Sequence, residues 1–243
     1  MWGSCIPSLQ KLKRGQIYST SYSGYARRAL IFIAPGDPFQ HKGHVLDPDA
    51  RYAVLFGNPE GWEICLINVY APNVDSGTYF GEVVRAASPY LTAEIILAGD
   101  SNCVLDGTLD QDPAAAYETP QLVDTMRELQ LQDLWRHRNP TLRKYSCYTP
   151  VANTYSRLDY CLVSETLSPL IQAIAYLACY ISDNSPLLVK FKKGYTRPAV
   201  LTWHLLLEAL SDAPFEGAVW DGLMQYFDAN CERPRPGDVI GRQ

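Results

Sequence analysis

Short apolar runs that end in turn-forming residues recur along this chain, and they constrain its fold more than any other feature. Leu30–Ile33 is one such run, ended by the turn signal Ala34-Pro35-Gly36. Two more runs, residues 52–56 and 62–69, flank a Gly-Asn-Pro-Glu-Gly segment that is typical of a hairpin. Further strands are predicted at residues 94–98, 145–149, 158–163, 171–177 and 187–191. Strands mixed with helices, without regular βαβ alternation, predict an α+β layered sandwich.

Helical signals lie between these strands and after them. Residues 75–78 are predicted to cap a helix that ends at Ala87, and Thr119-Pro120 is predicted to begin another. The second helix would carry its apolar residues on one face: Leu122, Val123, Met126 and Leu129. From Thr196 onward the apolar period is again helical, and the Arg-Pro-rich residues 233–237 indicate a frayed tail.

The charge balance and the cysteines exclude some functional classes. With 21 basic and 26 acidic side chains the net charge is −5, which argues against a protein that coats nucleic acid by bulk charge. It leaves open an enzyme whose cation site is itself acidic. Seven scattered cysteines without C-x-x-C spacing fit a reducing intracellular setting, in the nucleus or the cytoplasm. No apolar run is long enough to cross a bilayer, so no membrane association is expected.

Two predicted strand ends carry residues suited to phosphodiester chemistry. The apolar residues 95–98 run into Gly99-Asp100-Ser101-Asn102, where a carboxylate can accept a proton from water and an amide can orient that water. In Ser156-Arg157-Leu158-Asp159, an arginine can bind a phosphate, and an acid two residues later faces the same way. Each segment also has a simpler interpretation: a turn in the first case, and a surface Arg–Asp pair on an edge strand in the second.

A third segment, Ser182-Asp183-Asn184-Ser185, lies between two predicted strands. Asp183 could bind a divalent cation, and Asn184 could donate a hydrogen bond to a phosphate oxygen. The same residues are also typical of a turn before Pro186. None of the three segments identifies a function alone, but their order and spacing together indicate more.

From residue 22 to residue 191 the chain resembles the endonuclease/exonuclease/phosphatase superfamily, and within it the endonuclease domain of LINE-type (non-LTR) retrotransposons. Five stretches carry this resemblance in the family's order. They are residues 68–73 for the family's NVYAPN, residues 99–102 for GDFN, residues 133–140 with 145–148 for D-x-W-R…P…Y-T-F, residues 154–159 for TYSRID, and residues 182–185 for SDHS. Residues 198–230 also resemble the stretch that links this endonuclease to a reverse transcriptase.

The resemblance implies a four-layer α/β/β/α sandwich of the DNase I-like kind that nicks DNA with Mg²⁺ or Mn²⁺. In the family pattern, Asp100 is the base that activates water, Asn102 orients that water, and Tyr70 hydrogen-bonds the scissile phosphate. Asp159 orients the catalytic histidine, and Asp183 assists the metal. Four further residues would lie near the DNA backbone: Asn73, Ser146, Ser156 and Arg157. DNA is therefore the expected partner.

Two departures from the family pattern weaken the expected site. Asn184 holds the position of the catalytic histidine, and its amide has no proton that titrates near neutral pH. Loss of a positioned acid or base typically lowers the rate by about 10²–10⁴. The chain also lacks the family's opening strands, one of which carries the glutamate that is the principal metal ligand. An N-terminally truncated domain is therefore expected, with an uncovered apolar face and a metal that is weakly bound or not bound.

The sequence thus predicts a retrotransposon-type DNA endonuclease domain whose hydrolytic activity is weakened or absent. Two alternatives stay open: a non-catalytic DNA-binding remnant or decayed retroelement product, and another phosphodiesterase or phosphatase of the same superfamily. The predicted organisation is a poorly defined segment at residues 1–21, the endonuclease-like domain at 22–191, and a helical linker with a disordered tail at 192–243. Four bases before the strand at residue 145 would contact a DNA backbone or lie in a solvated loop: Arg136, Arg138, Arg143 and Lys144.

Overall fold

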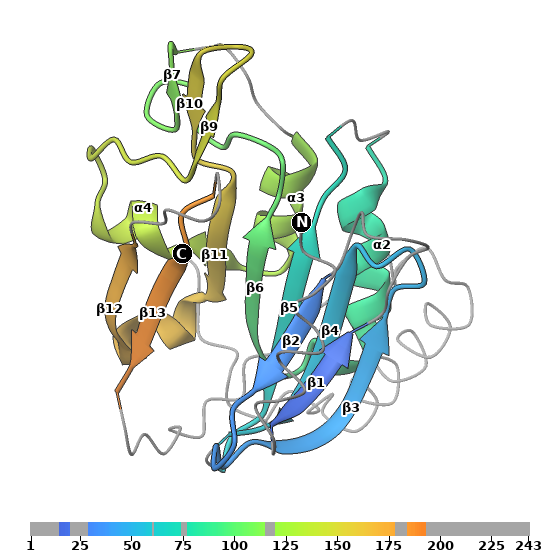
Figure 1. Ribbon diagram of the computed structural model, residues 1–243. Helices are drawn as coiled ribbons and strands as arrows, with labels where there is room; N and C mark the ends of the chain where they lie inside the picture. Colours follow the sequence, from blue (N-terminus) through green and yellow to red (C-terminus); the bar gives the residue numbers. More distant parts are fainter. Residues whose placement is uncertain are drawn as a thin grey trace, which may run out of the picture. The chain divides into compact units, whose positions relative to one another are not determined.

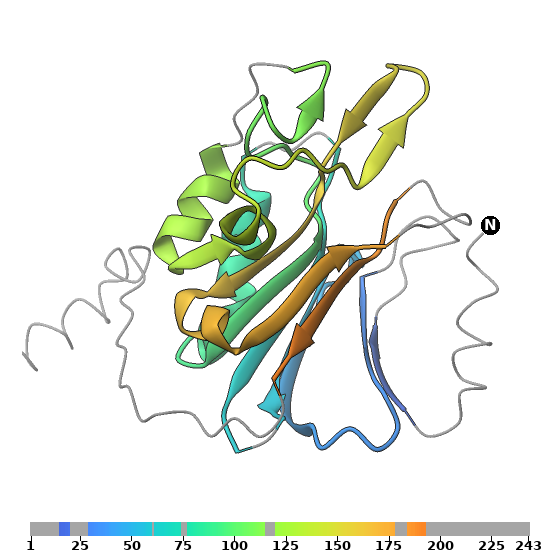
Figure 2. The same ribbon diagram turned by 90° about the vertical axis from the view of Figure 1, so that its left-hand side faces the viewer.

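The computed structural model describes residues 15–19, 29–59, 61–73, 77–114, 120–177 and 184–192. Asp183 and the helices predicted after Thr196 lie outside the described residues. The described residues form one large mixed sheet with helices on one face and two separate strand pairs on the other (Figures 1 and 2). This arrangement confirms the predicted α+β sandwich, and three of its four expected layers lie in the described part of the chain.

A six-stranded sheet with the order β3-β4-β5-β6-β11-β8 forms the centre of the fold. Its strands are β3 (Gln40–Leu46), β4 (Tyr52–Asn58), β5 (Ile64–Tyr70), β6 (Glu94–Asp100), β11 (Asp159–Ser164) and β8 (Leu131–Asp133). Neighbouring strands are antiparallel except β5 and β6, which are parallel. A parallel pair needs a crossover, which here contains helix α2 (Tyr79–Ala87) and the short 3₁₀ helix η1 (Ser88–Tyr90).

Helices α2 and α3 (Pro120–Glu128) contact each other and cover one face of the sheet (Figure 1). The buried face of α2 follows the helical period: Tyr79, Phe80, Val83, Val84 and Ala87. The prediction that Val123 lies on the buried face of α3 was wrong. Val123 is 36% exposed, since its neighbour Leu122 points to the core and the next residue along a helix points away from it. The buried residues Leu122, Thr125 and Leu129 recur at intervals of three and four, which is the spacing of one helix face.

Two antiparallel strand pairs lie on the other face of the sheet (Figure 2). One pair is β1 (Gln16–Ser19) with β2 (Leu30–Ile33), and the other is β12 (Ile171–Tyr176) with β13 (Leu187–Phe191). The β1–β2 pair packs on the core cluster around Leu55 and Ile64, and the β12–β13 pair on the cluster around Cys161 and Val163. Trp62 contacts both clusters and therefore lies between the two pairs.

A small three-stranded sheet lies beyond one end of the large one (Figure 1, top). It has the order β7-β10-β9, with β7 at Gln111–Asp112, β10 at Thr154–Ser156 and β9 at Cys147–Thr149. The β9–β10 hairpin leads directly into β11. Helix α4 (Leu134–Arg138) follows β8 and contacts β11 and β12, while the 3₁₀ helix η2 (Glu165–Leu170) joins β11 to β12.

Every strand predicted as an apolar run is present, with ends that shift by a few residues. The strands that the sequence did not predict are short or polar, as in the edge strand β3, whose first four residues are mostly exposed. β1 lies inside residues 1–21, the segment expected to be poorly defined. Among the described helices, none combines the length and the apolar character that a membrane crossing needs.

Candidate functional site

Strand pairing brings three of the predicted site residues to one end of the large sheet. Asp159, the first residue of β11, is the register partner of Asp100, the last residue of β6. Tyr70, the last residue of β5, is the parallel partner of Asp100 on its other side. Register partners project from the same face of a sheet, so these three side chains lie in a row. That face is the one covered by β1–β2 and β12–β13.

Asn102 lies in the loop that follows β6 and adopts a left-handed backbone conformation, with φ of 47°. Asparagine tolerates this conformation better than most residues. Its backbone N–H donates to Asp100 Oδ1 over 2.9 Å, and its side-chain Nδ2 donates to the Ala71 carbonyl over 2.6 Å. The amide group therefore ties the end of β6 to the loop after β5. This contact occupies a donor that the sequence assigned to orienting water.

Asn184 faces Asp100 from the segment before β13. Its backbone forms an isolated antiparallel bridge with Cys147, at the start of the β9–β10 hairpin. Its side-chain Nδ2 lies 3.5 Å from Asp100 Oδ2, at the limit of a hydrogen bond. The residue in the family's histidine position thus reaches the carboxylate of the candidate base, but an amide cannot exchange a proton with it at neutral pH.

Two serines predicted to lie near the DNA backbone are buried instead. Ser146 is 2% exposed, and its Oγ accepts hydrogen bonds from the backbone N–H groups of Leu158 and Asp159, over 2.9 and 3.1 Å. It fixes the chain where β11 begins. Ser156 is 8% exposed and lies at the end of β10, whereas Asn73 is exposed in the loop after β5. Of these three residues, only Asn73 is open to a large ligand.

Arg157 corrects the sequence interpretation most sharply, because its side chain is buried and binds acids rather than phosphate. Its Nε and Nη2 donate to both carboxylate oxygens of Asp110, over 2.8 and 2.7 Å, and Nη2 also donates to Asp133 over 2.6 Å. Its guanidinium lies over the ring of Tyr160, 4.4 Å from the centroid. Burial alone would lower the pKa of Arg157, but the hydrogen bonds it donates to Asp110 and the charge of Asp133 raise it above its ordinary value. The surface-pair alternative is wrong as well.

The four bases expected beside the DNA divide into two groups. Arg136 is bound to the buried Asp110 and also donates to the carbonyls of Asn139 and Leu142. Arg138 donates to backbone carbonyls at the C-terminal end of η2 and the start of β12. Both arginines therefore stabilise the fold. Arg143 and Lys144 are exposed in the loop before β9, where they can meet a polyanion.

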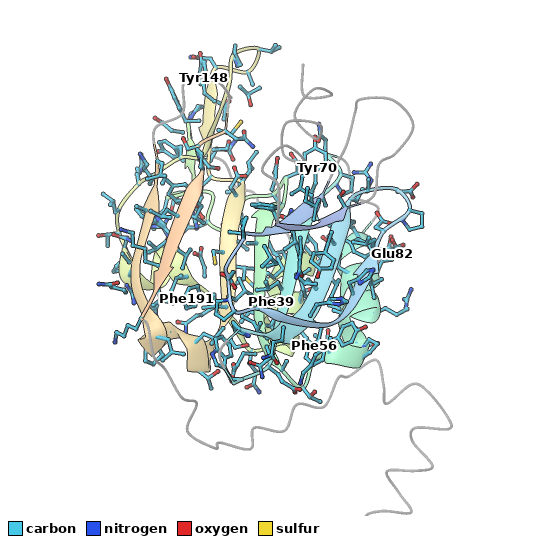
Figure 3. All side chains as sticks on the ribbon, turned by 60° about the horizontal axis from the view of Figure 1, so that its bottom comes forward. Phe39, Phe56, Tyr70, Glu82, Tyr148 and Phe191 are labelled. Carbon is cyan, nitrogen blue, oxygen red and sulfur yellow. The ribbon has the colours of Figure 1, made fainter. Side chains whose placement is uncertain are left out.

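Sequence reasoning missed two features near the site. Asp110 and Asp133 are the buried partners of Arg157, and Asp133 also caps α4 by accepting from the Arg136 backbone N–H. The second feature is a row of tyrosines on the β9–β10 hairpin, where the Tyr148 and Tyr155 rings lie 4.6 Å apart and are partly exposed. Figure 3 shows Tyr148 on the hairpin, well away from the body of the sheet. The sequence signal that could have indicated this row is the presence of three tyrosines within eleven residues, at positions 145, 148 and 155.

The fold family implies a divalent metal, which the described donor set does not hold by itself. No group of three or more acidic, histidine or cysteine side chains gathers around a possible metal position within the described residues. Asp100 and Asp159 are two neighbouring carboxylates, but Asp100 is already engaged with Asn102 and Asn184. Asp183, the predicted metal residue, lies outside the described residues.

The fold and this site define a DNase I-like α+β sandwich, as the comparisons with solved structures also show. The 3'-5' exonuclease NExo from Neisseria meningitidis matches with a TM-score of 0.58 and 17% identity, over 76% of this chain and 82% of that one. A second structure of this enzyme from Neisseria, described as a 3' phosphatase bound to a product DNA hairpin, matches with a TM-score of 0.59 and 16% identity, over the same shares.

A retrotransposon protein has the same fold. The endonuclease domain of TRAS1, a telomere-specific non-LTR retrotransposon, matches with a TM-score of 0.56 and 18% identity, over 73% of this chain and 80% of that one. An AP endonuclease from Leishmania major matches with a TM-score of 0.54 and 16% identity, over 72% and 69%. No protein-family model matches the chain. At these identities the likeness establishes the fold and not the activity.

Proposed function

We propose that this chain is a DNA-binding domain of the retrotransposon endonuclease type in which phosphodiester hydrolysis is impaired. The observation that carries the proposal is the set of groups around Asp100. Tyr70 and Asp159 are its register partners, and the amide of Asn184 lies 3.5 Å from its carboxylate. The arrangement suits a hydrolytic site, but an amide stands where proton exchange is needed. The TRAS1 likeness and the five sequence stretches support the retrotransposon type.

The chemistry of these groups explains the proposed impairment. A carboxylate such as Asp100 can accept the proton of an attacking water, and the Tyr70 hydroxyl can donate a hydrogen bond to a phosphate oxygen. The phosphate charge that grows in the transition state needs positive charge or strong donors beside it. Asn184 offers a neutral N–H donor, which is weaker than an imidazolium. The described residues therefore supply a base and a donor, but no acid for the leaving oxygen.

Plasmid nicking tests the hydrolytic part of this proposal. Supercoiled plasmid would be incubated with the full chain in Mg²⁺ and, separately, in Mn²⁺. We expect little or no nicking by the wild type, and Asn184→His to raise nicking by about tenfold or more, within the range given by a restored acid. Asp100→Ala in the Asn184→His background should abolish the gain. Gln172→His, at an exposed position on β12, is the matched control and should change nothing.

Two results would count against this part. If the wild type nicks as fast as Asn184→His, then the asparagine at position 184 does not impair hydrolysis. If Gln172→His raises nicking equally, the gain comes from an added histidine anywhere on the surface.

DNA binding is tested separately, by the anisotropy of a labelled duplex at low and moderate salt. We expect salt-sensitive binding that survives Asp100→Ala, because backbone contacts rest on cationic groups. The double variant Arg143→Ala and Lys144→Ala should weaken binding and reduce the salt dependence. Arg127→Ala, an exposed base on α3 that pairs with Asp124, is the matched control. Absence of any affinity at low salt would exclude DNA as the partner.

A further inference from the structure

Two histidines lie side by side at the edge of the large sheet. In the described part of the chain, β3 is the outermost strand on one side of this sheet (Figure 1). His41 and His44 both belong to β3, and both are exposed. His41 Nε2 lies 3.0 Å from His44 Nδ1, which is a hydrogen-bond distance. Each imidazole therefore meets the other through one ring nitrogen.

A β-bulge explains why these two side chains can meet. Residues three apart in a regular strand point to opposite faces of the sheet. The register of β3 against β4 shifts here, because Lys42 is an extra residue. His41 is consequently the partner of Gly57. His44 is the partner of Leu55, which lies two residues from Gly57 and so on the same face. Both imidazoles therefore project from the face that β1–β2 covers.

A tyrosine on β1 restrains the two rings. The ring centroid of Tyr18 lies 5.1 Å from that of His41 and 5.5 Å from that of His44, and the two imidazole centroids are 5.2 Å apart. The Tyr18 hydroxyl donates to Gln16 Oε1 over 2.7 Å, which fixes the tyrosine in turn. Rings that are already held lose less side-chain entropy when a ligand binds them.

The lysine of the bulge adds little repulsion for a cation at the histidine pair. Lys42 Nζ forms an ion pair with Glu63 over 2.6 Å. It also lies 5.8 Å from the ring centroid of Phe56. Phe56 follows Leu55 in β4 and so belongs to the opposite face of the sheet. The charge of Lys42 is therefore paired and directed away from the two imidazoles.

The spacing of the two nitrogens matches that of two ligands on one metal ion. Imidazole nitrogens bind such ions at about 2.0–2.1 Å. At this bond length, two ligands are about 2.9 Å apart at an angle of 90° and about 3.3 Å apart at the tetrahedral angle. The observed 3.0 Å is closer to the first value. Right angles between nitrogen and oxygen ligands are typical of Cu²⁺ and Ni²⁺.

We propose that His41 and His44 together bind a divalent metal ion of the copper and nickel class, with water at the remaining positions. Binding replaces the hydrogen bond between the rings. The ring that donated its N–H carries the proton on its other nitrogen instead, so both facing nitrogens offer a lone pair and no proton is lost. Within the described residues no third histidine, cysteine or acid completes the site, which leaves those positions to water.

This site is separate from the candidate site around Asp100. Strand register through β4 and β5 places His41 level with Glu94, the first residue of β6. Asp100 is the last residue of β6, six residues and about 20 Å farther along the strand. The metal binding therefore does not rest on the DNA function proposed above, and it can be measured without DNA.

Titration calorimetry with Ni²⁺ tests the proposal on the full chain, prepared without a histidine tag. Accessible cysteines are alkylated first, because thiolates also bind this metal. We expect saturable binding of one equivalent that excess Mg²⁺ does not displace, since Mg²⁺ takes oxygen ligands. His41→Ala and His44→Ala should each weaken binding about tenfold or more, because the second ligand acts at a high effective concentration. His137→Ala, at an exposed position on α4, is the matched control and should bind as the wild type does.

A variant that moves one imidazole tests the geometry rather than the number of histidines. Gln40→His combined with His41→Gln shifts the ring by one residue, to the other face of the strand. It should bind Ni²⁺ as weakly as His41→Ala. Circular dichroism verifies that each variant folds, as expected for substitutions at exposed positions.

Line broadening by paramagnetic Cu²⁺ locates the metal by NMR. Substoichiometric Cu²⁺ should broaden the ring signals of His41, His44 and Tyr18 before those of His137, because all three rings of the cluster lie close to the proposed ion.

Three results would overturn the proposal. The first is the absence of saturable Ni²⁺ binding by the wild type. The second is wild-type affinity in either alanine variant or in the variant with the moved imidazole. The third is Cu²⁺ broadening at His137 at the same concentration as at His41, which would show binding to any exposed histidine.

Discussion

Replacing Arg157 by methionine should destabilise this protein strongly, because two buried carboxylates depend on the guanidinium. The side chains of Arg157, Asp110 and Asp133 are 1%, 0% and 9% exposed, so solvent cannot replace the lost charge. Arg157→Met removes three charge-assisted hydrogen bonds. The remaining partner of Asp110 is then the Arg136 side chain, and that of Asp133 is the Arg136 backbone N–H. Breaking one side of a buried pair typically costs about 3–5 kcal/mol.

The expected loss is a large part of the total stability of a domain, which is about 5–15 kcal/mol. At about 2–4 °C per kcal/mol for a chain of this size, the melting temperature should fall by about 6–20 °C. Urea unfolding of the full chain, followed by circular dichroism, measures the change in free energy of unfolding. Arg157→Lys should fall between wild type and Arg157→Met, because lysine keeps the charge but not the two-pronged contact.

Arg127→Met is the matched control for this experiment. Arg127 pairs with Asp124 on α3, and their side chains are 74% and 66% exposed. An exposed pair of this kind contributes at most about 0.5 kcal/mol, and salt screens it. If Arg157→Met unfolds within about 1 kcal/mol of the wild type, or no more easily than Arg127→Met, then the buried ion cluster is not what holds the end of the sheet together.

Two further predictions concern backbone strain and thiol reactivity. Gly99→Ala should unfold far more easily than Gly36→Ala. Both glycines have a positive φ, 128° at Gly99 and 82° at Gly36, which costs an alanine about 1–2 kcal/mol at either position. At Gly99 the added Cβ would also lie 2.1 Å from a backbone oxygen, whereas at Gly36 it would meet no atom within 4 Å. Burial raises the pKa of Cys161 to about 12, so at pH 8 its thiol should resist alkylation in the folded chain and react only in urea. The half-buried Cys103 should react both in the folded chain and in urea. Peptide mass spectrometry after alkylation measures both reactions. Equal unfolding of the two alanine variants, or rapid labelling of native Cys161, would contradict the respective prediction.

The central strands could be predicted because their sequences are apolar runs that must be buried. β5 and β6 form the middle of the sheet for this reason. The ends of the two apolar runs predicted that Tyr70 and Asp100 lie at strand ends, and each is the last residue of its strand. The edge strand β3 could not be predicted, because its outer position leaves it polar and its identity depends on pairing with β4. Short strands such as β8 depend likewise on a neighbour already in place.

The role of Arg157 was beyond sequence reasoning for a related reason. Its partners Asp110 and Asp133 lie 47 and 24 residues earlier, and no local pattern links them. An arginine beside candidate catalytic residues favours a phosphate contact on chemistry alone. Only the fold shows that β11 is an inner strand between β6 and β8, where a charged side chain at its start must be paired.

The contacts that hold the site together are separate from the residue that its chemistry lacks. Ser146 Oγ accepts from the two amides that begin β11, and the Ser101 N–H donates to the Leu158 carbonyl over 2.9 Å, so Asp159 and Asp100 stay adjacent through the backbone. Asn184 reaches Asp100 only over 3.5 Å, a distance at which a hydrogen bond contributes little. Asn184→His should therefore leave the melting temperature nearly unchanged while nicking rises. A variant that nicked no better and also unfolded several degrees earlier would show instead that Asn184 is part of the scaffold.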